Sequence, residues 1–298
     1  QDFVNGQISS DDFSTIILND TNYQNSLTGE DLSLYNTFRQ SLINKDRQTQ
    51  DVLISSMIYN VIYNEIGKKD RPNPFYLNAK VELAGNAFAL FKSNPREVGV
   101  ISGETKKIFD IPYSQFVKFD VDVRKYFTFF NDKHTLALRQ FIGVGIPYGN
   151  SSTMPFVRSY FNGGSNDIRA WRVFGGLGPA DSQLDEKIRS YIMDNVKLTT
   201  NIEYRMPFTP MFEGAAFIDA GNIWSLKDSG FGDEFKFNKF LSQMGVGTGV
   251  GLRVNVAYIT LRLDAAYKVY DLNQPVGDRW VLGNTWKPVL NSAFGYPF

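Results

Sequence analysis

Residues 114–130, SQFVKFDVDVRKYFTFF, alternate between apolar and charged side chains with a period of two. Successive side chains of a β-strand point to opposite faces of a sheet, whereas a helix repeats about every 3.6 residues. One set of positions is wholly apolar and the other wholly charged: Val117, Phe119, Val121 and Val123 against Lys118, Asp120, Asp122 and Arg124. The pattern predicts a long strand with one apolar face and one charged face.

Similar alternation recurs along most of the chain and predicts nine strands. Their expected ranges are 51–66, 74–91, 113–130, 134–148, 193–208, 212–224, 240–254, 255–270 and 288–298. Such lengths exceed the usual ~5–6 residues of globular strands and suit tilted membrane spans of about 9–11 residues. A short connection at 131–133 contrasts with long ones at 149–192, 225–239 and 271–287, as in transmembrane barrels. A soluble antiparallel sandwich also has one apolar and one polar face, so alternation alone leaves both folds open.

The composition narrows the possible classes of function. The chain holds 25 Phe and 15 Tyr but no run of about 18 apolar residues, which suits membrane strands and not a membrane helix. Its 31 basic and 31 acidic residues balance, so nothing favours nucleic acid as a partner. There is no cysteine, and His134 is the single histidine, which excludes thiolate and histidine-cluster metal sites. We expect neither a metal nor a cofactor.

Residues 1–50 do not share the strand pattern. FSTIILN at 13–19 fits a short strand, and GEDLSLYNTFRQSLIN at 29–44 fits a surface helix. The helix would carry four packing residues at helical spacing: Leu32, Tyr35, Phe38 and Leu42. We therefore divide the chain into a loop, helix and possible strand at 1–50 and barrel strands at 51–298, with a lumen loop at 149–192.

The last residues, PVLNSAFGYPF, are rich in aromatic side chains. Alternation places Leu290, Phe294, Tyr296 and Phe298 on one face of a final strand. In a soluble protein, such aromatics at a fraying end would favour aggregation. Phe294, Tyr296 and Phe298 resemble the terminal strand signal by which assembly machinery recognises bacterial outer-membrane proteins.

Several motifs occur in an order that resembles one superfamily. They are MPFVRSYFNGGSNDIRAWRVFGGLGP at 154–179, NIEYRMPF at 201–208, GAAFIDAGNIW at 214–224 and GVGTGVGLRVN at 245–255, followed by a terminal phenylalanine. Over residues 74–298 the chain resembles the C-terminal half of the barrel subunit of the Bam and Tam outer-membrane assembly machineries, the POTRA-barrel or bacterial surface antigen family. AGN at 84–86 and the terminal GYPF look most like members from Bacteroidetes-like bacteria, including Tam-type lipoproteins.

In that superfamily a long loop with a Val-Arg-Gly-Phe or Ile-Arg-Gly-Tyr tetrad folds back into the barrel lumen. The corresponding tetrad here is Ile168, Arg169, Ala170 and Trp171. Alanine stands where glycine is usual, which restricts the turn to a negative φ. The resemblance implies that Arg169 reaches acidic groups on the inner wall, and strand parity offers Glu203 and Asp219 as partners. A buried arginine needs such carboxylates, because an unpaired charge away from water is costly.

The segment GVGTGVGL has one face without side chains, formed by Gly245, Gly247, Gly249 and Gly251. One interpretation is a bend or a flexible strand. The other is that the bare face leaves room for the inserted loop, since glycine lets another backbone approach closely.

The resemblance implies both a fold and a function. The fold is all-β, the C-terminal portion of a sixteen-stranded transmembrane antiparallel β-barrel with a lumen-inserted loop, in the bacterial outer membrane. The function is to assist insertion of β-barrel proteins, or export of substrates, through a weak seam between the first and last strands, without bond chemistry. Nascent β-barrel precursors, other machinery subunits and outer-membrane lipid or lipopolysaccharide are the implied partners. Nine or ten strands without POTRA repeats are too few for the whole, so we expect a part of a longer protein.

Two other classes of function stay open. A passive outer-membrane porin or receptor would not need the arginine loop. An outer-membrane hydrolase would need a histidine base beside a serine or a carboxylate. The sequence offers only His134, beside the tight turn at NDKHT, where a solvated surface role is the simpler interpretation.

Overall fold

The computed structural model describes residues 21–29, 31–32, 35, 48–90, 95–97, 104–130, 134–178, 193–227, 234–256, 258–283 and 287–298. The chain divides into two compact units. The smaller comprises Gln1–Ser56, Ala84–Phe116 and Pro147–Val157, and the larger comprises Met57–Leu83, Val117–Ile146 and Arg158–Phe298. No helix in the described ranges is long and apolar enough to cross a membrane.

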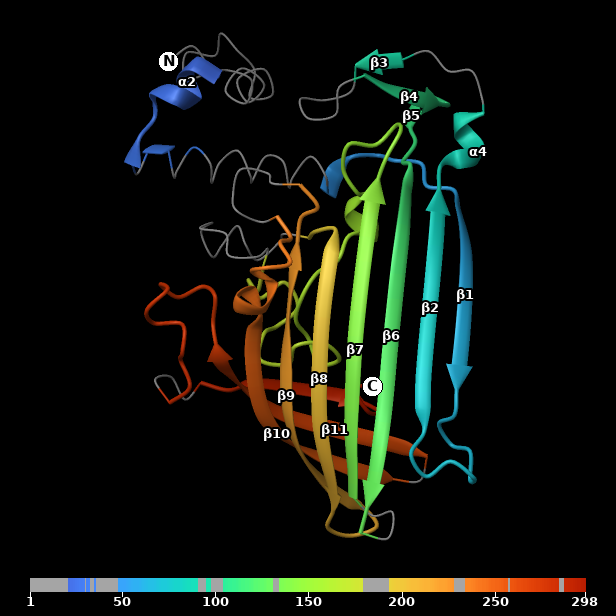
Figure 1. Ribbon diagram of the computed structural model, residues 1–298, viewed down its shortest axis with the longest axis vertical. Helices are drawn as coiled ribbons and strands as arrows, with labels where there is room; N and C mark the ends of the chain where they lie inside the picture. The colour runs from blue at the N-terminus through green and yellow to red at the C-terminus, as the bar shows by residue number, and fades with distance from the viewer. Residues whose placement is uncertain are drawn as a thin grey trace. The chain divides into compact units, whose positions relative to one another are not determined.

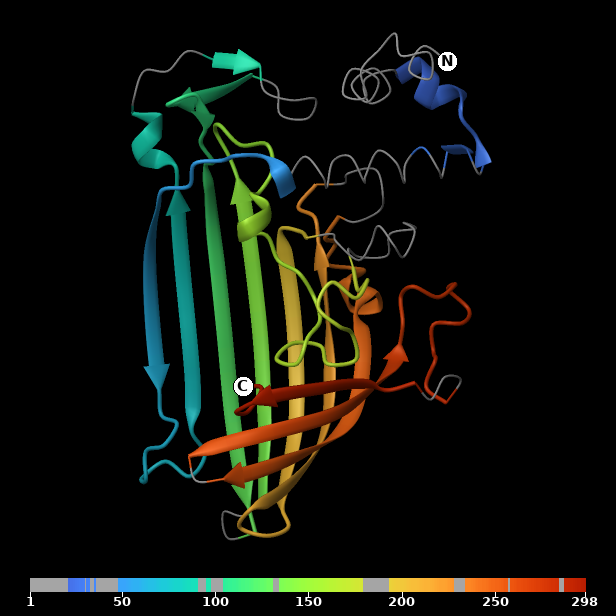
Figure 2. The same ribbon diagram turned by 180° about the vertical axis from the view of Figure 1, so that it is seen from behind.

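The larger unit is built on a nine-stranded sheet with the neighbour order β1-β2-β6-β7-β8-β9-β10-β11-β12. The strands are β1 (Ser56–Asn64), β2 (Phe75–Ala84), β6 (Phe116–Phe129), β7 (His134–Pro147), β8 (Val196–Pro207), β9 (Phe212–Trp224), β10 (Gly245–Val256), β11 (Ile259–Tyr270) and β12 (Val289–Phe294). The pairs from β7 to β12 are antiparallel, and the arrows of β1, β2, β6 and β7 alternate in direction (Figure 1). Both views show β10, β11 and β12 crossing at a large angle to β6 and β7 (Figure 2). Eight of the nine predicted ranges contain one strand of this sheet, β10 runs two residues past the predicted end at 254, and the all-β antiparallel fold is confirmed.

The smaller unit holds elements that the alternation did not predict. A three-stranded sheet consists of β3 (Pro95–Glu97), β4 (Glu104–Ile108) and β5 (Ile111–Pro112). The strand expected over 74–91 ends at Ala84, because Gly85 has a φ of 77° and the chain then enters α4 (Asn86–Ala89). A Cβ at Gly85 would also overlap the Ser114 carbonyl oxygen, so glycine is required at this turn.

The other helical segments that have bounds within the described residues are short: α2 (Thr21–Ser26) and the 3₁₀ turns η1 (Phe156–Arg158) and η2 (Phe240–Gln243). In the range expected to form a surface helix, Leu32 and Tyr35 are helical. Phe38 and Leu42, and the strand expected at 13–19, lie outside the described residues.

Burial in the nine-stranded sheet is the reverse of that in a soluble sandwich. On β11, Leu261 and Leu263 are 42% and 55% exposed, whereas Arg262 and Asp264 are each 1% exposed. Strands β8 and β9 repeat this arrangement, with Asn201, Glu203 and Asp219 buried and Ile202 and Ile218 exposed. A soluble antiparallel sheet packs its apolar face against the core and leaves its polar face in water. The apolar face of this sheet points outward, which is the polarity of a membrane barrel and not of a sandwich.

The main apolar cluster on the inner face is made jointly by the sheet and the long connection between β7 and β8. The connection contributes Ile168, Ala170, Trp171 and Leu177, and the strands and the end of β11 contribute Phe217, Ala266 and Leu272. The loop that the sequence assigned to the lumen therefore supplies most of the apolar side chains of this cluster.

Candidate functional site

The candidate site is the β7–β8 loop where it lies on the inner face of the larger unit. Between Arg158 and Gly178 the loop contacts every strand from β2 to β12 along the sheet order. In Figure 2 it is the yellow-green coil drawn over the strands of the sheet. Of the lumen loop expected at 149–192, residues 149–157 belong to the smaller unit and residues 179–192 lie outside the described residues.

Arg169 is fully buried, and two carboxylates of the inner face hold its guanidinium group. Its Nε and Nη2 donate to Asp219 Oδ2 and Oδ1 at 2.8 and 2.9 Å, a bidentate pair. Its Nη1 donates to Glu203 Oε2 at 2.5 Å. The backbone N–H of Arg169 adds a bond of 3.1 Å to Asp219 Oδ2. The structure thus brings together the arginine and both carboxylates that strand parity put forward.

The aromatic ring of Phe217 packs against the guanidinium group of Arg169. The Arg169 Cζ lies 3.4 Å from the ring centroid of Phe217, which stands opposite Gly249 in the β9–β10 register. A Cβ at Gly249 would lie 2.5 Å from Phe217 Cζ, so the missing side chain lets the ring lie flat below the arginine. Burial alone would lower the pKa of Arg169, but the hydrogen bonds and charges of Asp219 and Glu203 outweigh it and raise the pKa. Arg169 therefore stays charged.

Three further arginines and one carboxylate of the wall join the same network. Arg205 Nε donates to Glu203 Oε1 at 2.8 Å, and Arg253 bridges Glu203 Oε2 at 3.0 Å and Asp264 Oδ1 at 2.6 Å. Arg262 Nε lies 3.2 Å from Asp264 Oδ2. Our sequence reasoning did not connect these residues to Arg169. The alternation could have placed them on the inner face. Arg253 continues the every-second-residue series of the glycine face, and Arg262 and Asp264 belong to the polar face of their strand.

The glycine face of β10 serves two different neighbours. A Cβ at Gly245 would lie 2.5 Å from Leu177 Cδ1 and 3.3 Å from Trp171 Cη2, and a Cβ at Gly247 would overlap the Cβ of Ala170. These two glycines accommodate the loop, whereas Gly249 and Gly251 accommodate wall side chains. At Gly251 those are Arg253 and Asp264, which a Cβ would overlap. Here the face packs closely and is not merely flexible.

Ala170 fits the turn that glycine makes in the resembling family. It is 1% exposed and does not occur among the non-glycine residues with positive φ. Its methyl group points at Gly247 on β10. Because Gly247 has no side chain, the methyl group of Ala170 fits against β10.

Asp167 fixes the loop next to Arg169. Its carboxylate accepts hydrogen bonds from Lys197 Nζ at 2.7 Å, Thr199 Oγ1 at 3.0 Å and the Gly163 N–H at 2.9 Å. On the other side of Arg169, Asn291 of β12 donates to the Arg169 carbonyl at 3.0 Å. The loop is therefore bonded to both sides of the curved sheet.

The expectation that Phe294, Tyr296 and Phe298 share one face of a final strand is wrong. Strand β12 ends at Phe294, which is 76% exposed, and Gly295 then adopts a φ of 74° that turns the chain away. Phe298 is buried in a cluster with Tyr126 and Ala137. The cause is the left-handed turn at glycine, which ends the alternation on which the prediction depended.

The Phe298 carbonyl accepts a hydrogen bond of 3.2 Å from Arg205 Nη2, which ties the chain end to the wall network. The Arg205 guanidinium also lies 4.3 Å from the ring centroid of Tyr296. Arg205 therefore links the last residues to Glu203, one of the carboxylates that hold Arg169.

His134 has no catalytic setting in the described part of the chain. Its Nδ1 lies 2.7 Å from the Tyr204 hydroxyl, and its ring packs against Phe130. No group of three potential metal ligands occurs among the described residues. Neither observation favours a hydrolase.

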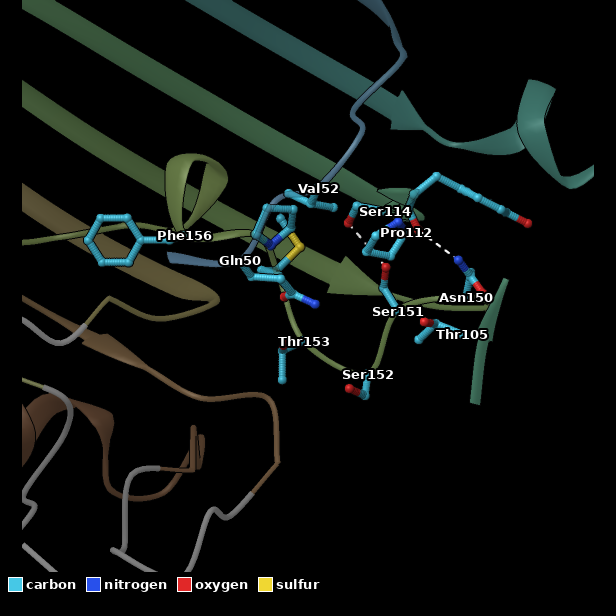
Figure 3. Close-up of a pocket in the computed structure, with 13 residues that line it drawn as sticks. Gln50, Val52, Thr105, Pro112, Ser114, Asn150, Ser151, Ser152, Thr153 and Phe156 are labelled. Carbon is cyan, nitrogen blue, oxygen red and sulfur yellow. Dashed lines mark hydrogen bonds between the residues drawn. The ribbon is translucent and has the colours of Figure 1, made fainter. Parts of the chain in front are cut away.

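The smaller unit contains a cavity of about 50 Å³ (Figure 3). Ser114 and Ser151 form a hydroxyl pair at 3.1 Å, and Asn150 Nδ2 donates to the carbonyls of Lys106 and Tyr113 at 2.9 and 2.8 Å. The described residues that line it include no carboxylate, lysine, arginine or histidine. The side chains of Ser114, Ser151 and Asn150 bond to one another or to the backbone, as at a braced loop junction.

Fold and site together define a class: β-barrel proteins with an apolar outer face, a charged inner face and a loop held inside by an arginine. The Omp85 superfamily domain matches residues 4–286, and the chain belongs to that superfamily. No curated protein sequence matches the chain significantly. Among solved structures, it is similar to BamA from Haemophilus ducreyi lacking POTRA domains 1–3, with 13% identity and a TM-score of 0.44. The match covers 81% of this chain and 58% of the BamA chain, so the chain spans less than two thirds of that relative.

Proposed function

We propose that the chain is the barrel part of a factor that assembles β-barrel proteins into the bacterial outer membrane, or translocates substrates across it. The observation that carries this proposal is the seat of Arg169 on Asp219 and Glu203, inside a sheet whose charged face is buried and whose apolar face is exposed. A passive pore needs no such loop, whereas an assembly barrel can use it to hold the wall in one shape.

The edges of the sheet offer the means to act on an incoming strand. In the described residues, β1 has β2 as its one neighbour and β12 has β11 as its one neighbour. Strand β12 pairs with only Leu261–Ala266 of the longer β11. An edge with unpaired N–H and C=O groups templates another strand. We infer that nascent β-barrel precursors are the clients and that they pair at such an edge.

The exposed outer face supports the proposed location and lipid contacts. Large apolar side chains project from strands across the sheet, among them Met57, Ile142, Ile218, Val250 and Leu263. Contact with hydrocarbon would remove these side chains from water. We infer that this face contacts outer-membrane lipid, and that other subunits of an assembly machinery are partners of the protein.

Replacing Arg169 with alanine in the full-length protein tests the proposal. The matched control is Arg172→Ala, because Arg172 lies on the same loop but is exposed. The readout is the amount of folded β-barrel clients in the outer membrane, by heat-modifiable mobility in gels. We expect Arg169→Ala to lower client assembly while its own folded level stays close to that of Arg172→Ala. Equal client assembly in the two variants would overturn the proposal and favour a porin or receptor.

The hydrolase alternative has its own test. His134→Gln removes the one histidine of the chain. Loss of a hydrolytic activity in this variant, with client assembly unaffected, would support an enzyme. We expect no change in either measurement, because the imidazole bonds to a phenol and not to a serine or a carboxylate.

A further inference from the structure

A second set of contacts holds the loop about ten residues before Arg169, on a different part of the wall. Tyr160 is 6% exposed, and its hydroxyl donates to Asp120 Oδ1 of β6. Lys118 Nζ lies 4.1 Å from the centroid of the Tyr160 ring, and Lys80 Nζ of β2 lies 3.1 Å from Asp120 Oδ2. The phenol is therefore bonded to a carboxylate that is itself ion-paired.

The wall is shaped to receive the Tyr160 ring. A Cβ at Gly143 of β7 would lie 2.5 Å from Tyr160 Cζ and 2.7 Å from Cε1 and the hydroxyl oxygen. The three nearest atoms all belong to that ring, so Gly143 provides a slot for it. The backbone of Tyr160 is fixed as well, by paired N–H···O bonds of 2.8 and 2.9 Å with Asp194. The slot at Gly143, the hydrogen bond to Asp120 and the backbone pair with Asp194 together hold the Tyr160 side chain in one position.

The charge of Arg158 reinforces this attachment. Its Nε lies 3.3 Å from Glu82 Oε1, and Glu82 on β2 is 1% exposed. The Arg158 carbonyl accepts a bond of 2.9 Å from Lys118 Nζ. A buried carboxylate such as Glu82 needs a cation, because removing one partner of a buried pair leaves an uncompensated charge.

We propose that Arg158 and Tyr160, with Glu82, Asp120 and Gly143, form a stem anchor that positions the loop independently of Arg169. The stem anchor uses β2, β6 and β7, whereas the carboxylates around Arg169 come from β8, β9 and β11. The loop is thus a crossbar between two parts of the curved sheet, and Tyr160 is a positioning residue. The purpose of the crossbar rests on the proposed function, but its seating can be measured without any client.

The absence of cysteine from the chain allows a clean labelling experiment. Ser159 lies between the two anchor residues and is 7% exposed, so Ser159→Cys introduces a single buried thiol whose maleimide labelling reports opening of the stem. The test variant is Tyr160→Phe, which keeps the ring and removes the hydroxyl. The matched control is Tyr204→Phe, which removes a hydroxyl bonded to His134 on another part of the sheet.

We expect Tyr160→Phe to raise the labelling rate about tenfold or more, because it removes a hydrogen bond to a charged acceptor. Tyr204→Phe should label at the parent rate. Equal rates for the two variants would overturn the stem anchor. The ring remains in both variants, so a folding failure does not obscure the comparison.

Gly143 provides an independent test of the slot. Gly143→Ala should accelerate labelling when Tyr160 is present, since the new methyl group occupies the position of the ring. In a Tyr160→Ala background the same substitution should add little. Equal effects of Gly143→Ala in both backgrounds would show that the slot does not hold the ring.

The outcome separates the anchor from the proposed function. If Arg169→Ala leaves client assembly intact but Tyr160→Phe still opens the stem, the anchor stands and the assembly role fails. If the labelling rates do not change while Arg169→Ala abolishes assembly, the assembly role stands and the anchor fails.

Discussion

Replacing Gly247 with alanine is expected to unseat the loop tip, and the size of the effect can be worked out from the packing. The new Cβ would overlap the Cβ of Ala170 and lie 3.4 Å from the Tyr267 carbonyl oxygen and 3.6 Å from Ala170 Cα. Ala170 is 1% exposed, and it packs in the apolar cluster with Ile168, Trp171 and Leu177. Overpacking of this kind costs about 1–3 kcal/mol. The cost falls on the seated loop, because the carbonyl oxygen of Tyr267 is in ordinary contact distance.

A second substitution, Ala170→Gly, should relieve the overlap that Gly247→Ala creates. Alone, it removes one buried methyl group, at about 0.8 kcal/mol. It also adds backbone freedom to the unseated loop, at roughly 0.4–1 kcal/mol. Combined with Gly247→Ala, it removes the atom that the new methyl group overlaps. We therefore expect a coupling free energy of about 1–2 kcal/mol, with the double variant more stable than the sum of the single ones predicts.

The assay is a double-mutant cycle on loop seating. Asn162 is 4% exposed and contacts the Leu177 carbonyl and Asn222, so Asn162→Cys gives a single buried thiol on the loop. The labelling rate of each variant, relative to the unfolded chain, gives the free energy of loop opening. Heat-modifiable gel mobility shows in parallel that the sheet remains folded.

Gly245→Ala is the matched control. Its Cβ would meet Leu177 and Trp171 instead of Ala170, so Ala170→Gly should not rescue it. If Ala170→Gly rescues both glycine variants equally, or neither, the specific fit of Ala170 to Gly247 is refuted. The specific fit is also refuted if the effects of Gly247→Ala and Ala170→Gly on the free energy of loop opening simply add in the double variant.

Three further outcomes follow from the contacts. Asp219→Asn should lower the free energy of loop opening by about 3 kcal/mol, as measured by labelling of Asn162→Cys. This value is at the low end for a broken buried ion pair, because Glu203 still binds Arg169. Phe298→Ala should lower the free energy of unfolding by about 3 kcal/mol, measured by urea titration, because the buried ring packs against Tyr126 and Ala137. The pKa of Tyr160 is raised above its ordinary value of about 10, mainly by burial and next by the hydrogen bond to Asp120. The pKa of Tyr160 is higher in the seated stem than in the opened one. The stabilisation of the seated stem by the protonated Tyr160 hydroxyl is therefore complete below about pH 10 and declines as the pH rises further. Stem labelling should increase above about pH 10 in the parent but not in Tyr160→Phe.

Alternation predicted the strands because side-chain parity is a local property of an extended chain. It could not predict β3 and β5, which have three and two residues and are too short to show a period. It also continued strands past Ala84 and Phe294, where Gly85 and Gly295 turn the backbone to positive φ. A glycine in a sequence does not reveal its own dihedral angle, so these ends depend on the structure.

The resemblance implied that Arg169 reaches carboxylates of the inner wall, and parity offered Glu203 and Asp219 because it places each on the polar face. It did not predict how the wall residues pair. Arg253 stands directly opposite Arg262 in the β10–β11 register, and two like charges in this position repel each other. Asp264 offsets the repulsion because it forms ion pairs with both arginines. The bridge from Arg253 to Glu203 joins strands separated by β9. Strand order and register are properties of the whole sheet and are not visible in any one segment.

The charges of the wall indicate how firmly the loop depends on one residue. Glu203 pairs with Arg205 and Arg253, and Asp264 pairs with Arg253 and Arg262, all from the strands themselves. In the part of the chain that the structure describes, Asp219 differs, because its ion-pair partner is Arg169 of the loop and its other side-chain contact is Asn201. With the loop withdrawn, Glu203 and Asp264 keep cations from the strands, whereas Asp219 loses Arg169 and Glu82 on β2 loses Arg158. The energetic difference between the seated and the withdrawn loop is therefore concentrated at Asp219, at Glu82, at the Gly247 contact and at the Tyr160 slot, while the pairs among Glu203, Asp264 and the strand arginines stay intact.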